Sequence, residues 1–571
     1  MASEPPPPDT AELPSPSNST QTSGSPSTAF AITMLLRPEY LSVVLTALGI
    51  IWLGAHGSLR RPPSAAPVKT KAGKRQPKEE KFAEGLVASD AIMFPVLAAG
   101  VLISLYYLIE WLQDPDLLNK IVRGYISIMA IASVGRLAGD LLHILTSFVF
   151  PSTWVDRGGT LYHIDADRHA QFVVDQVTGE ERIVEEKDTP LPGRLSIFSR
   201  SGPSRGLLWG IRHLLTEEWT VKFAMHGLMF VKFNVRLNDL VGYLLSIPVA
   251  IAYHLTGRNA LSNVLSTAMC YASFMLLSPT SFGIGTMVLW GLFVYDIVMV
   301  FYTPYMITVA TKLDAPIKLV FESSGGVSML GLGDIVVPGM LMGLALRFDL
   351  YQFYKKQIKL EPVDLTTELT TELASEHFTE KKQVLLHTQQ RRVKAPFVDP
   401  RGQWGSRFWS TKFGSLSPVK EASSAIAATA FPKPYFYASV TGYFLGMMAT
   451  LAMLVVFKHG QPALLYLVPG VTGALWLTAL ARGEIKDMLG YTEDGSLDTE
   501  DVVVEVDAEG NVVESKKEQV EEDIGKKPGE DVAEEAKPIK EQTAAPVQDE
   551  GDYDVFLFSI TAPRMSLHPE G

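Results

Sequence analysis

The sequence predicts an all-α membrane protein of about nine transmembrane helices with a disordered tail at each end. Hydrophobic residues make up 47% of the 571 residues, and most of them gather in runs long enough to cross a bilayer. The polar and charged residues lie mainly between these runs and at the two ends. A length prior of roughly 150 residues per domain suggests about four soluble domains, but apolar runs of this length override that prior.

Composition already excludes several classes of protein. The formal net charge is −12, which disfavours a nucleic-acid partner because nucleic-acid binding needs a basic surface. Cys270 is the only cysteine in the chain, so an intrachain disulfide and zinc or redox sites of the C-x-x-C type are excluded.

The two ends of the chain are predicted to be disordered. Residues 1–38 contain many Pro, Ser and Thr residues, including the run Pro5–Pro8, and no positively charged region that would begin a signal peptide. Asn18-Ser19-Thr20 is an N-glycosylation sequon, and both a modified and an unmodified Asn18 stay open. Residues 482–571 form an acidic tail, with 23 acidic and 7 basic residues from Tyr491 onward, too charged to collapse.

A helix needs about 20 mostly apolar residues to span a hydrocarbon core about 30 Å thick while satisfying its own backbone. Nine segments meet this requirement: 39–57, 89–109, 121–149, 238–256, 260–279, 283–309, 326–346, 435–457 and 462–481. They divide the chain into helices 1–3 (39–149), a loop (150–237), helices 4–7 (238–346), a loop insertion (348–434) and helices 8–9 (435–481). The first loop mixes apolar and charged residues, which favours a few short strands.

Charge asymmetry around the first segment predicts the orientation. Arg37 is the only basic residue before it, whereas eight lysines and arginines lie between residues 60 and 81. Because basic residues stay on the cytosolic side, the N-terminus is predicted to be outside the cytosol. Nine crossings then put both long loops and the acidic tail in the cytosol.

Ionisable side chains within a span are costly and therefore informative. Arg136 and Asp140 lie four residues apart in the third span, the spacing of an ion pair on one helix face, and His143 follows one turn later. A structural ion pair and part of a proton or ion path are both open readings of these three residues.

Two aspartates have no cationic neighbour of this kind. Asp296 lies in the sixth span and Asp334 in the seventh, so we expect them to face each other at similar depth. Two carboxyl groups a few ångströms apart in a low dielectric cannot both ionise, so they share a proton. One can then act as general base on a water while the other protonates a carbonyl oxygen, which is the chemistry of aspartic proteolysis.

Local motifs support this chemistry. Gly331-Leu332-Gly333 precedes Asp334 and removes two side chains where a substrate backbone must approach. Pro462-Ala463-Leu464 opens the ninth span. Together with Tyr295-Asp296, these motifs resemble the signature of the intramembrane aspartyl proteases, the family of signal peptide peptidase and presenilin. Longer matches, such as Ala315–Phe321 and Phe457–Pro462, resemble signal peptide peptidase more than presenilin.

The resemblance implies a helix bundle of that family in which Asp296 and Asp334 are the catalytic pair. It also implies that Tyr295, Gly331, Leu332, Gly333, Pro462, Ala463 and Leu464 shape the site or bind substrate, with no metal and no cofactor. The implied substrates are transmembrane segments, such as remnant signal peptides and type II membrane proteins. The implied location is the endoplasmic reticulum membrane, with a lumenal N-terminus and a cytosolic C-terminus.

Other functions are considered beside this one. The chain contains no His-Glu-x-x-His, no Gly-x-Ser-x-Gly and no Asp-Thr/Ser-Gly motif, which disfavours zinc, rhomboid-like serine and soluble aspartic proteases. An ion-coupled transporter using the aspartates and a non-catalytic membrane chaperone or scaffold stay open. Protein partners considered are a second copy of the chain and membrane-protein degradation factors.

Overall fold

The structure of the protein is a computed structural model. It describes residues 38–67, 84–112, 115–156, 160–166, 168–174, 181–184, 187–199, 201–225, 229–313, 316–323, 326–365, 387–410, 428–457, 461–497, 503–505 and 556–561. The predicted disorder of residues 1–37 and of most of the acidic tail lies outside the described residues.

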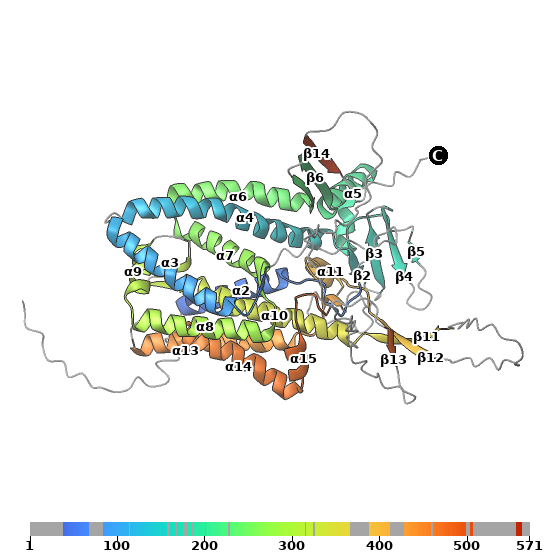
Figure 1. Cartoon of the computed structure of the whole chain (residues 1–571). Helices are drawn as coiled ribbons and strands as arrows, with labels where there is room; N and C mark the ends of the chain where they lie inside the picture. The colour runs from blue at the N-terminus through green and yellow to red at the C-terminus, as the bar shows by residue number, and fades with distance from the viewer. Residues whose placement is uncertain are drawn as a thin grey trace, which may run out of the picture.

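Long helices form the body of the protein and run side by side along one direction (Figure 1). Those that overlap the nine predicted spans are α2 (Pro38–Gly57), α3 (Asp90–Leu112), α4 (Pro115–Val149), α6 (Leu237–Thr256), α7 (Asn259–Leu276), α8 (Phe282–Phe301), α10 (Gly333–Lys355), α13 (Pro434–Phe457) and α14 (Leu464–Arg482). Within the described residues, seven of them, all except α7 and α10, are long and apolar enough to cross a membrane. The prediction of a helical multi-pass membrane protein is confirmed.

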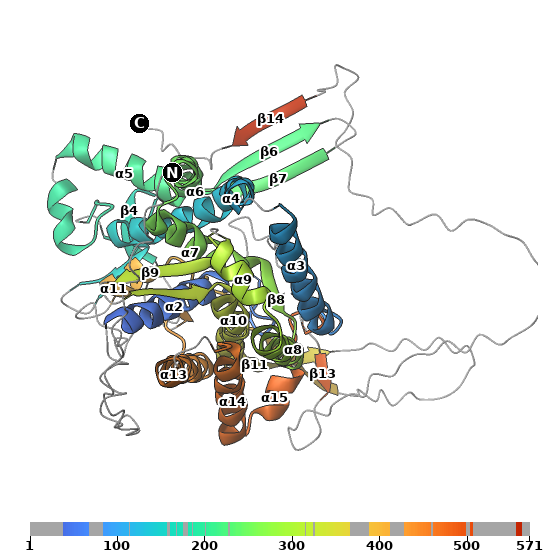
Figure 2. The same cartoon turned by 90° about the vertical axis from the view of Figure 1, so that its left-hand side faces the viewer.

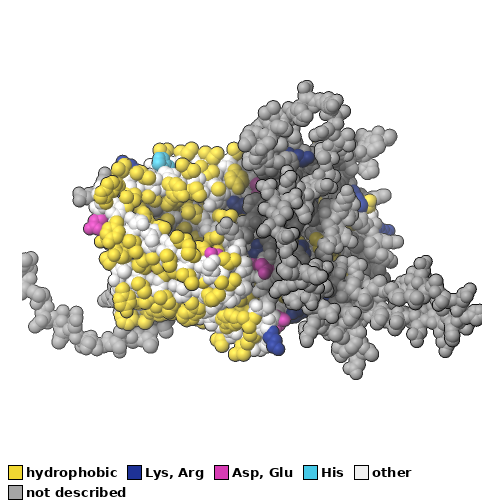
Figure 3. Space-filling view, viewed as in Figure 1, with side chains coloured by type: hydrophobic (Ala, Val, Ile, Leu, Met, Phe, Trp, Pro, Cys, Tyr) yellow, Lys and Arg dark blue, Asp and Glu magenta, His cyan; other side chains and the backbone are white. Residues whose placement is uncertain are grey.

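The outer surface of this bundle is apolar. Figure 3 shows hydrophobic side chains covering the helical part of the molecule, with few charged groups among them. Leu244 and Leu255 of α6, for example, are 68% and 75% exposed. A surface of this kind is stable against lipid rather than water.

Helix α10 is the centre of the bundle. Seen along the helices, it is surrounded by α2, α7, α8, α13 and α14 (Figure 2), and every residue from Pro338 to Leu350 is buried. Its polar side chains are satisfied by protein groups: the Asp349 carboxylate accepts the backbone N–H groups of Tyr435 and Phe436 at 3.2 and 2.9 Å. A helix buried in this way needs no lipid-facing surface, which explains why α10 is less apolar than its neighbours.

Glycine permits close contact between two pairs of helices. A Cβ added at Gly242 of α6 would lie 2.5 Å from both the Gly135 oxygen and the Gly139 nitrogen of α4. On the other side of the bundle, a Cβ at Gly442 of α13 would lie 2.3 Å from the Gly470 oxygen of α14. Small residues four apart allow helix backbones to approach closely in membranes, so both helix pairs depend on these positions.

The parts outside the bundle gather at one of its ends (Figure 1). The first long connection contains the predicted short strands, and we call residues 150–236 the lobe. Its elements are a sheet of β2 (Thr153–Val155), β3 (Leu161–Asp165), β4 (Ala170–Val174) and β5 (Glu181–Ile183), then η1 (Gly193–Ser199), α5 (Gly202–Thr216), β6 (Trp219–Met225) and β7 (Met229–Val235). The β2–β5 sheet is antiparallel in chain order, and β14 (Phe556–Thr561) pairs with β6. The second connection contributes β11 (Lys359–Leu365), β12 (His387–Val393) and α11 (Trp404–Trp409), and β13 (Val503–Glu505) pairs with β12.

Arg212 of α5 holds the lobe together. Its buried guanidinium donates to the backbone oxygens of Pro151, Pro190 and Ile164 at 3.0, 3.3 and 3.4 Å. Trp154, Ile164 and Trp209 form the small apolar core next to it. One side chain therefore satisfies carbonyl groups from three separate segments of the lobe.

Three predicted spans differ from the helices observed. Residues 326–331 are not helical: β10 (Gly326–Gly331) pairs antiparallel with β9 (Lys318–Ser323), and α10 begins at Gly333 and continues to Lys355. The predicted span 283–309 is interrupted, because α8 ends at Phe301 and α9 (Tyr305–Lys312) follows as a separate helix. Residues 277–279 form β8, which pairs in parallel with β1 (Glu84–Leu86). Short apolar runs are compatible with either a strand or a helix, and glycine disfavours the helix.

The first part of the predicted acidic tail is folded against the bundle. Residues 482–497 were expected to be disordered, but α15 (Ile485–Gly490) follows α14 directly, and Tyr491 is 2% exposed. The Glu493 side chain is 6% exposed and bonds to Arg347 of α10 at 2.7 Å. The expectation was wrong for this segment because average composition does not reveal a single buried, paired carboxylate.

Candidate active site

Asp296 occupies a buried position on α8, an otherwise apolar helix, and is 3% exposed. Its Oδ2 accepts a hydrogen bond of 3.1 Å from the backbone N–H of Leu464. Leu464 is the first residue of α14, and the first N–H groups of a helix have no partner within the helix. The carboxyl group therefore caps α14, which ties the sixth predicted span to the ninth.

Asp334 lies in the first turn of α10, directly after the β9–β10 hairpin. The Leu332 N–H donates to the Ile317 oxygen at 3.1 Å and fixes the chain where the strand gives way to the helix. A Cβ at Gly331 would lie 3.3 Å from Asp334 Oδ2, whereas a Cβ at Gly333 would have no heavy atom within 4 Å. Gly331 thus leaves room for the carboxyl group, and Gly333 leaves open space beside it.

The two aspartates belong to one site. Helices α8 and α10 pack against each other, and α14 packs against both. The Asp334 and Asp296 carboxyl groups are close enough to interact electrostatically. Both aspartates therefore lie on helices that pack against each other and that share α14 as a neighbour.

The other predicted site residues lie on the same helices as this pair, at the end of β10, or at the start of α14. Pro462 and Leu464 are buried at the start of α14, and Ala463 is its N-cap residue. Tyr295 and Leu332 are half-buried and pack against the central apolar core. Three segments that are far apart in sequence thus meet around two carboxyl groups.

Tyr443 of α13 is a site residue that the sequence analysis did not identify. It is fully buried, and its hydroxyl donates to the backbone oxygen of Asp334 at 3.3 Å. It stands in an apolar span among other aromatic residues, so no sequence pattern distinguishes it from a packed core tyrosine.

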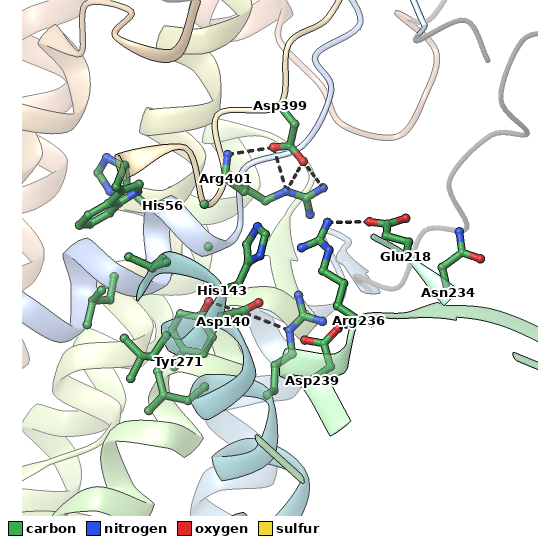
Figure 4. Close-up of a pocket in the computed structure, with 18 residues that line it drawn as sticks. His56, Asp140, His143, Glu218, Asn234, Arg236, Asp239, Tyr271, Asp399 and Arg401 are labelled. Atoms are coloured by element: carbon green, nitrogen blue, oxygen red, sulfur yellow. Dashed lines mark hydrogen bonds and ion pairs between the residues drawn. The ribbon is translucent and has the colours of Figure 1, made fainter. Parts of the chain in front are cut away.

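Arg136, Asp140 and His143 lie at a second location, at the end of the bundle beside the lobe. Arg136 Nε donates to Asp140 Oδ2 at 3.0 Å, and the Tyr271 hydroxyl donates to the same oxygen at 2.7 Å. Together with His143 these groups line a cavity of about 170 Å³, and Figure 4 shows Asp140, His143 and Tyr271 close to one another there. Further ion pairs join Arg236 to Glu218 and Arg401 to Asp399. Of the two open readings, the structure supports the ion pair.

The described residues contain no group of three or more His, Cys, Asp or Glu side chains arranged to hold a metal ion.

Comparison with known proteins gives a consistent result. The family model described as signal peptide peptidase matches residues 78–495, a range that contains both aspartates and the start of α14. The chain is similar to the signal peptide peptidase of Homo sapiens, with 26% identity over 505 residues that cover 86% of this chain and 90% of the relative. The signal peptide peptidase of Mus musculus is 26% identical over 470 residues, covering 80% and 84%.

A shorter match is found with intramembrane protease 2 of Caenorhabditis elegans, which is 29% identical over 279 residues, 47% of this chain and 46% of the relative. No solved structure matches the chain.

Proposed function

Because the chain belongs to the signal peptide peptidase family, we propose that it is an intramembrane aspartic endopeptidase whose catalytic pair is Asp296 and Asp334. The observation that carries the proposal is that these two acids lie on packed helices inside the bundle, close enough to interact electrostatically, with the start of α14 bonded to one of them. The names of the relatives, signal peptide peptidase and intramembrane protease, support hydrolysis within the membrane.

In the proposed mechanism the two carboxyl groups share one proton, because two carboxylates a few ångströms apart in a low dielectric cannot both be ionised. The ionised carboxyl takes a proton from a water molecule, whose oxygen attacks the scissile carbonyl carbon. The protonated carboxyl donates its proton to the carbonyl oxygen. Collapse of the tetrahedral intermediate then breaks the C–N bond: the amine leaves with the proton that the first carboxyl took from water, and a hydroxyl of the intermediate returns a proton to the second carboxyl.

The proposed substrates are helical membrane segments, such as remnant signal peptides and type II membrane proteins. A helical peptide keeps its carbonyl groups in hydrogen bonds, so a segment must unwind locally before it can be cut. The open space beside Gly333 supports the approach of such an unwound backbone. Gly331, Leu332 and the segment Pro462–Leu464 are proposed to shape the site around it.

We propose the endoplasmic reticulum membrane as the location, with a lumenal N-terminus and a cytosolic C-terminus. The charge asymmetry around α2 supports this orientation. The described parts of both long connections gather at one end of the bundle (Figure 1), which supports the even number of crossings proposed between them.

The test is cleavage of a type II helical peptide in vesicles reconstituted with the pure protein, read by mass spectrometry of the fragments. Asp296→Asn and Asp334→Asn each keep the size of the side chain and remove its acid–base function. Each is expected to lower the rate at least about a thousandfold, within the range for general acid–base catalysis.

Asp140→Asn is the matched control, since it removes another aspartate of the bundle that lies in the separate ion pair with Arg136. This variant is expected to retain activity. Cleavage retained by either variant of the proposed pair would refute the protease mechanism. Ion flux abolished by the same substitutions would favour a transporter, and binding of helices without cleavage by the wild type would favour a scaffold.

A further inference from the structure

Glu493 lies in a buried polar network just beyond the last long helix. Its Oε1 accepts hydrogen bonds from Arg347 Nε at 2.7 Å and from the Tyr491 hydroxyl at 2.9 Å. Its Oε2 accepts from Arg60 and, at 3.0 Å, from the Ser278 hydroxyl. Four side chains from four segments of the chain therefore converge on one carboxylate.

Arg347 extends this network within α10. Its Nη1 donates to Ser58 Oγ at 2.9 Å, and its Nη2 donates to Ser278 Oγ at 2.6 Å. The Arg347 and Glu493 side chains are only 4% and 6% exposed. Two charges buried to this extent are costly unless each satisfies the other, so removing one leaves the other uncompensated.

The backbone of the same segment attaches to the beginning of α8. The Glu493 N–H donates to the Thr280 oxygen at 2.9 Å, and Thr492 forms an isolated antiparallel bridge with Ser281, the N-cap residue of α8. The Tyr491 ring lies beside Phe348 of α10, with ring centroids 5.3 Å apart. We call residues 491–493 the latch, since they join α8 to α10.

These two helices carry the candidate catalytic pair. Asp296 lies 15 residues beyond Ser281, about 22 Å along α8, and Asp334 lies 13 residues before Arg347, about 20 Å along α10. A pivot of about 3° at the latch would move either carboxyl group by about 1 Å over such a length. Displacements of about 1 Å at a reacting centre cost on the order of a hundredfold in rate.

Opposite charges stabilise the latch at neutral pH. Burial raises the pKa of the Glu493 carboxyl, but Arg347 and Arg60 outweigh burial and hold the pKa below its ordinary value. The carboxylate is therefore ionised at neutral pH, and the ion pairs persist there.

We propose that Glu493 is a positioning residue of the protease, fixing the relative placement of α8 and α10 and thereby of the two aspartates. The inference rests on the proposed function. It assigns a role in turnover to a residue of the acidic tail that touches neither the candidate pair nor the start of α14.

The test compares Glu493→Gln with Asp487→Asn. Asp487 lies on the same short stretch of chain and also pairs with a basic residue of α10, since it accepts from Lys355 at 2.9 Å, but both side chains of that pair are 40% exposed. Exposed pairs contribute little. The two variants therefore differ chiefly in the burial of the ion pair that each one breaks.

Cleavage of the helical peptide is measured in vesicles, and turnover is divided by the number of sites titrated with an active-site-directed aspartyl protease inhibitor. Glu493→Gln is expected to lower kcat per titrated site at least tenfold with KM within twofold of wild type, while Asp487→Asn leaves both within twofold. A purely structural role would lower the number of titrated sites and leave kcat per site unchanged, which would overturn the inference.

Ser278→Ala is the milder second variant if Glu493→Gln gives no titratable sites. It removes one partner of both Arg347 and Glu493 without leaving either charge unpaired, and a fall in kcat of about threefold is expected from the loss of a hydrogen bond. An unchanged kcat would overturn the inference. An inactive wild type would refute the proposed function itself, whereas active wild type and equally active variants would refute only the role of the latch.

Discussion

Gly446→Ala is predicted to impair catalysis from a helix that carries no candidate catalytic residue. Gly446 lies on α13 where it meets α14, and an added Cβ would lie 2.7 Å from the Tyr466 oxygen and 3.0 Å from the Leu467 Cα. Ordinary contact begins near 3.4 Å, so α14 must retreat by about 0.7 Å. Both contacts are backbone atoms, which cannot rotate out of the way.

This displacement of α14 affects the candidate site directly. Tyr466 is two residues from Leu464, whose N–H donates to Asp296 Oδ2 at 3.1 Å. A shift of about 0.7 Å at Tyr466 displaces Leu464 relative to Asp296 and so disturbs the length and angle of this hydrogen bond. We expect kcat/KM to fall by about a hundredfold, as for other misplacements of this size, and stability to fall by about 1–3 kcal/mol from overpacking.

The matched control is Gly473→Ala on α14, where an added Cβ meets no heavy atom within 4 Å. It makes the same chemical change in a helix and is expected to be neutral or slightly stabilising. The assay is peptide cleavage in vesicles per inhibitor-titrated site. Values of kcat/KM within twofold of each other for the two variants would refute the argument that α13 positions the start of α14.

Two further predictions concern stability outside the candidate site. Burial lowers the pKa of the Arg212 guanidinium to about 10. Arg212→Met should destabilise the lobe by about 3 kcal/mol, because three carbonyl groups lose their donor. Limited proteolysis should then cut faster within residues 150–236, and unchanged cutting would contradict this role. Burial first, and Arg407 second, lower the pKa of Lys433 to about 8, below about 10.4 in the unfolded chain. The unfolded state therefore binds more protons between these values, so stability should rise from pH 8 to 10 by about 2 kcal/mol. Thermal inactivation midpoints should show this rise for wild type and a flat profile for Lys433→Met, and parallel profiles would contradict the assignment.

The helices could be predicted from sequence because the bilayer requires every span to have the same local composition, whatever its neighbours are. Each span needs about 20 apolar residues in succession, and that pattern is visible without knowledge of its neighbours. The pattern failed at residues 326–331, where Gly326, Gly331 and the apolar residues between them fit a helix start and a strand equally well. The decision there comes from pairing with β9, a partner that local composition does not specify.

The candidate aspartates could be predicted for a related reason. An acid inside an apolar span is costly enough to demand an explanation, so Asp296 and Asp334 stand out singly. Glu493 does not, because it is one of many acids in an acidic tail and only its partners make it exceptional. Arg347 did not stand out as a buried charge, because it directly follows the predicted end of the seventh span. No local pattern links it to Glu493, which lies 146 residues away.

The hydrogen bond between Leu464 and Asp296 joins groups 168 residues apart, and it explains why a proline-led helix start belongs to a site of two acids. Pro462 supplies no N–H, and the N–H groups that follow need acceptors that lipid cannot provide. A carboxyl oxygen on α8 meets that need for Leu464. The same bond fixes the orientation of the Asp296 side chain relative to α14, while Tyr443 holds the backbone at Asp334 from α13. The hydrogen bonds that satisfy backbone groups at these two positions are therefore the same ones that orient the candidate pair. The packing of α13 and α14 thus affects the chemistry directly.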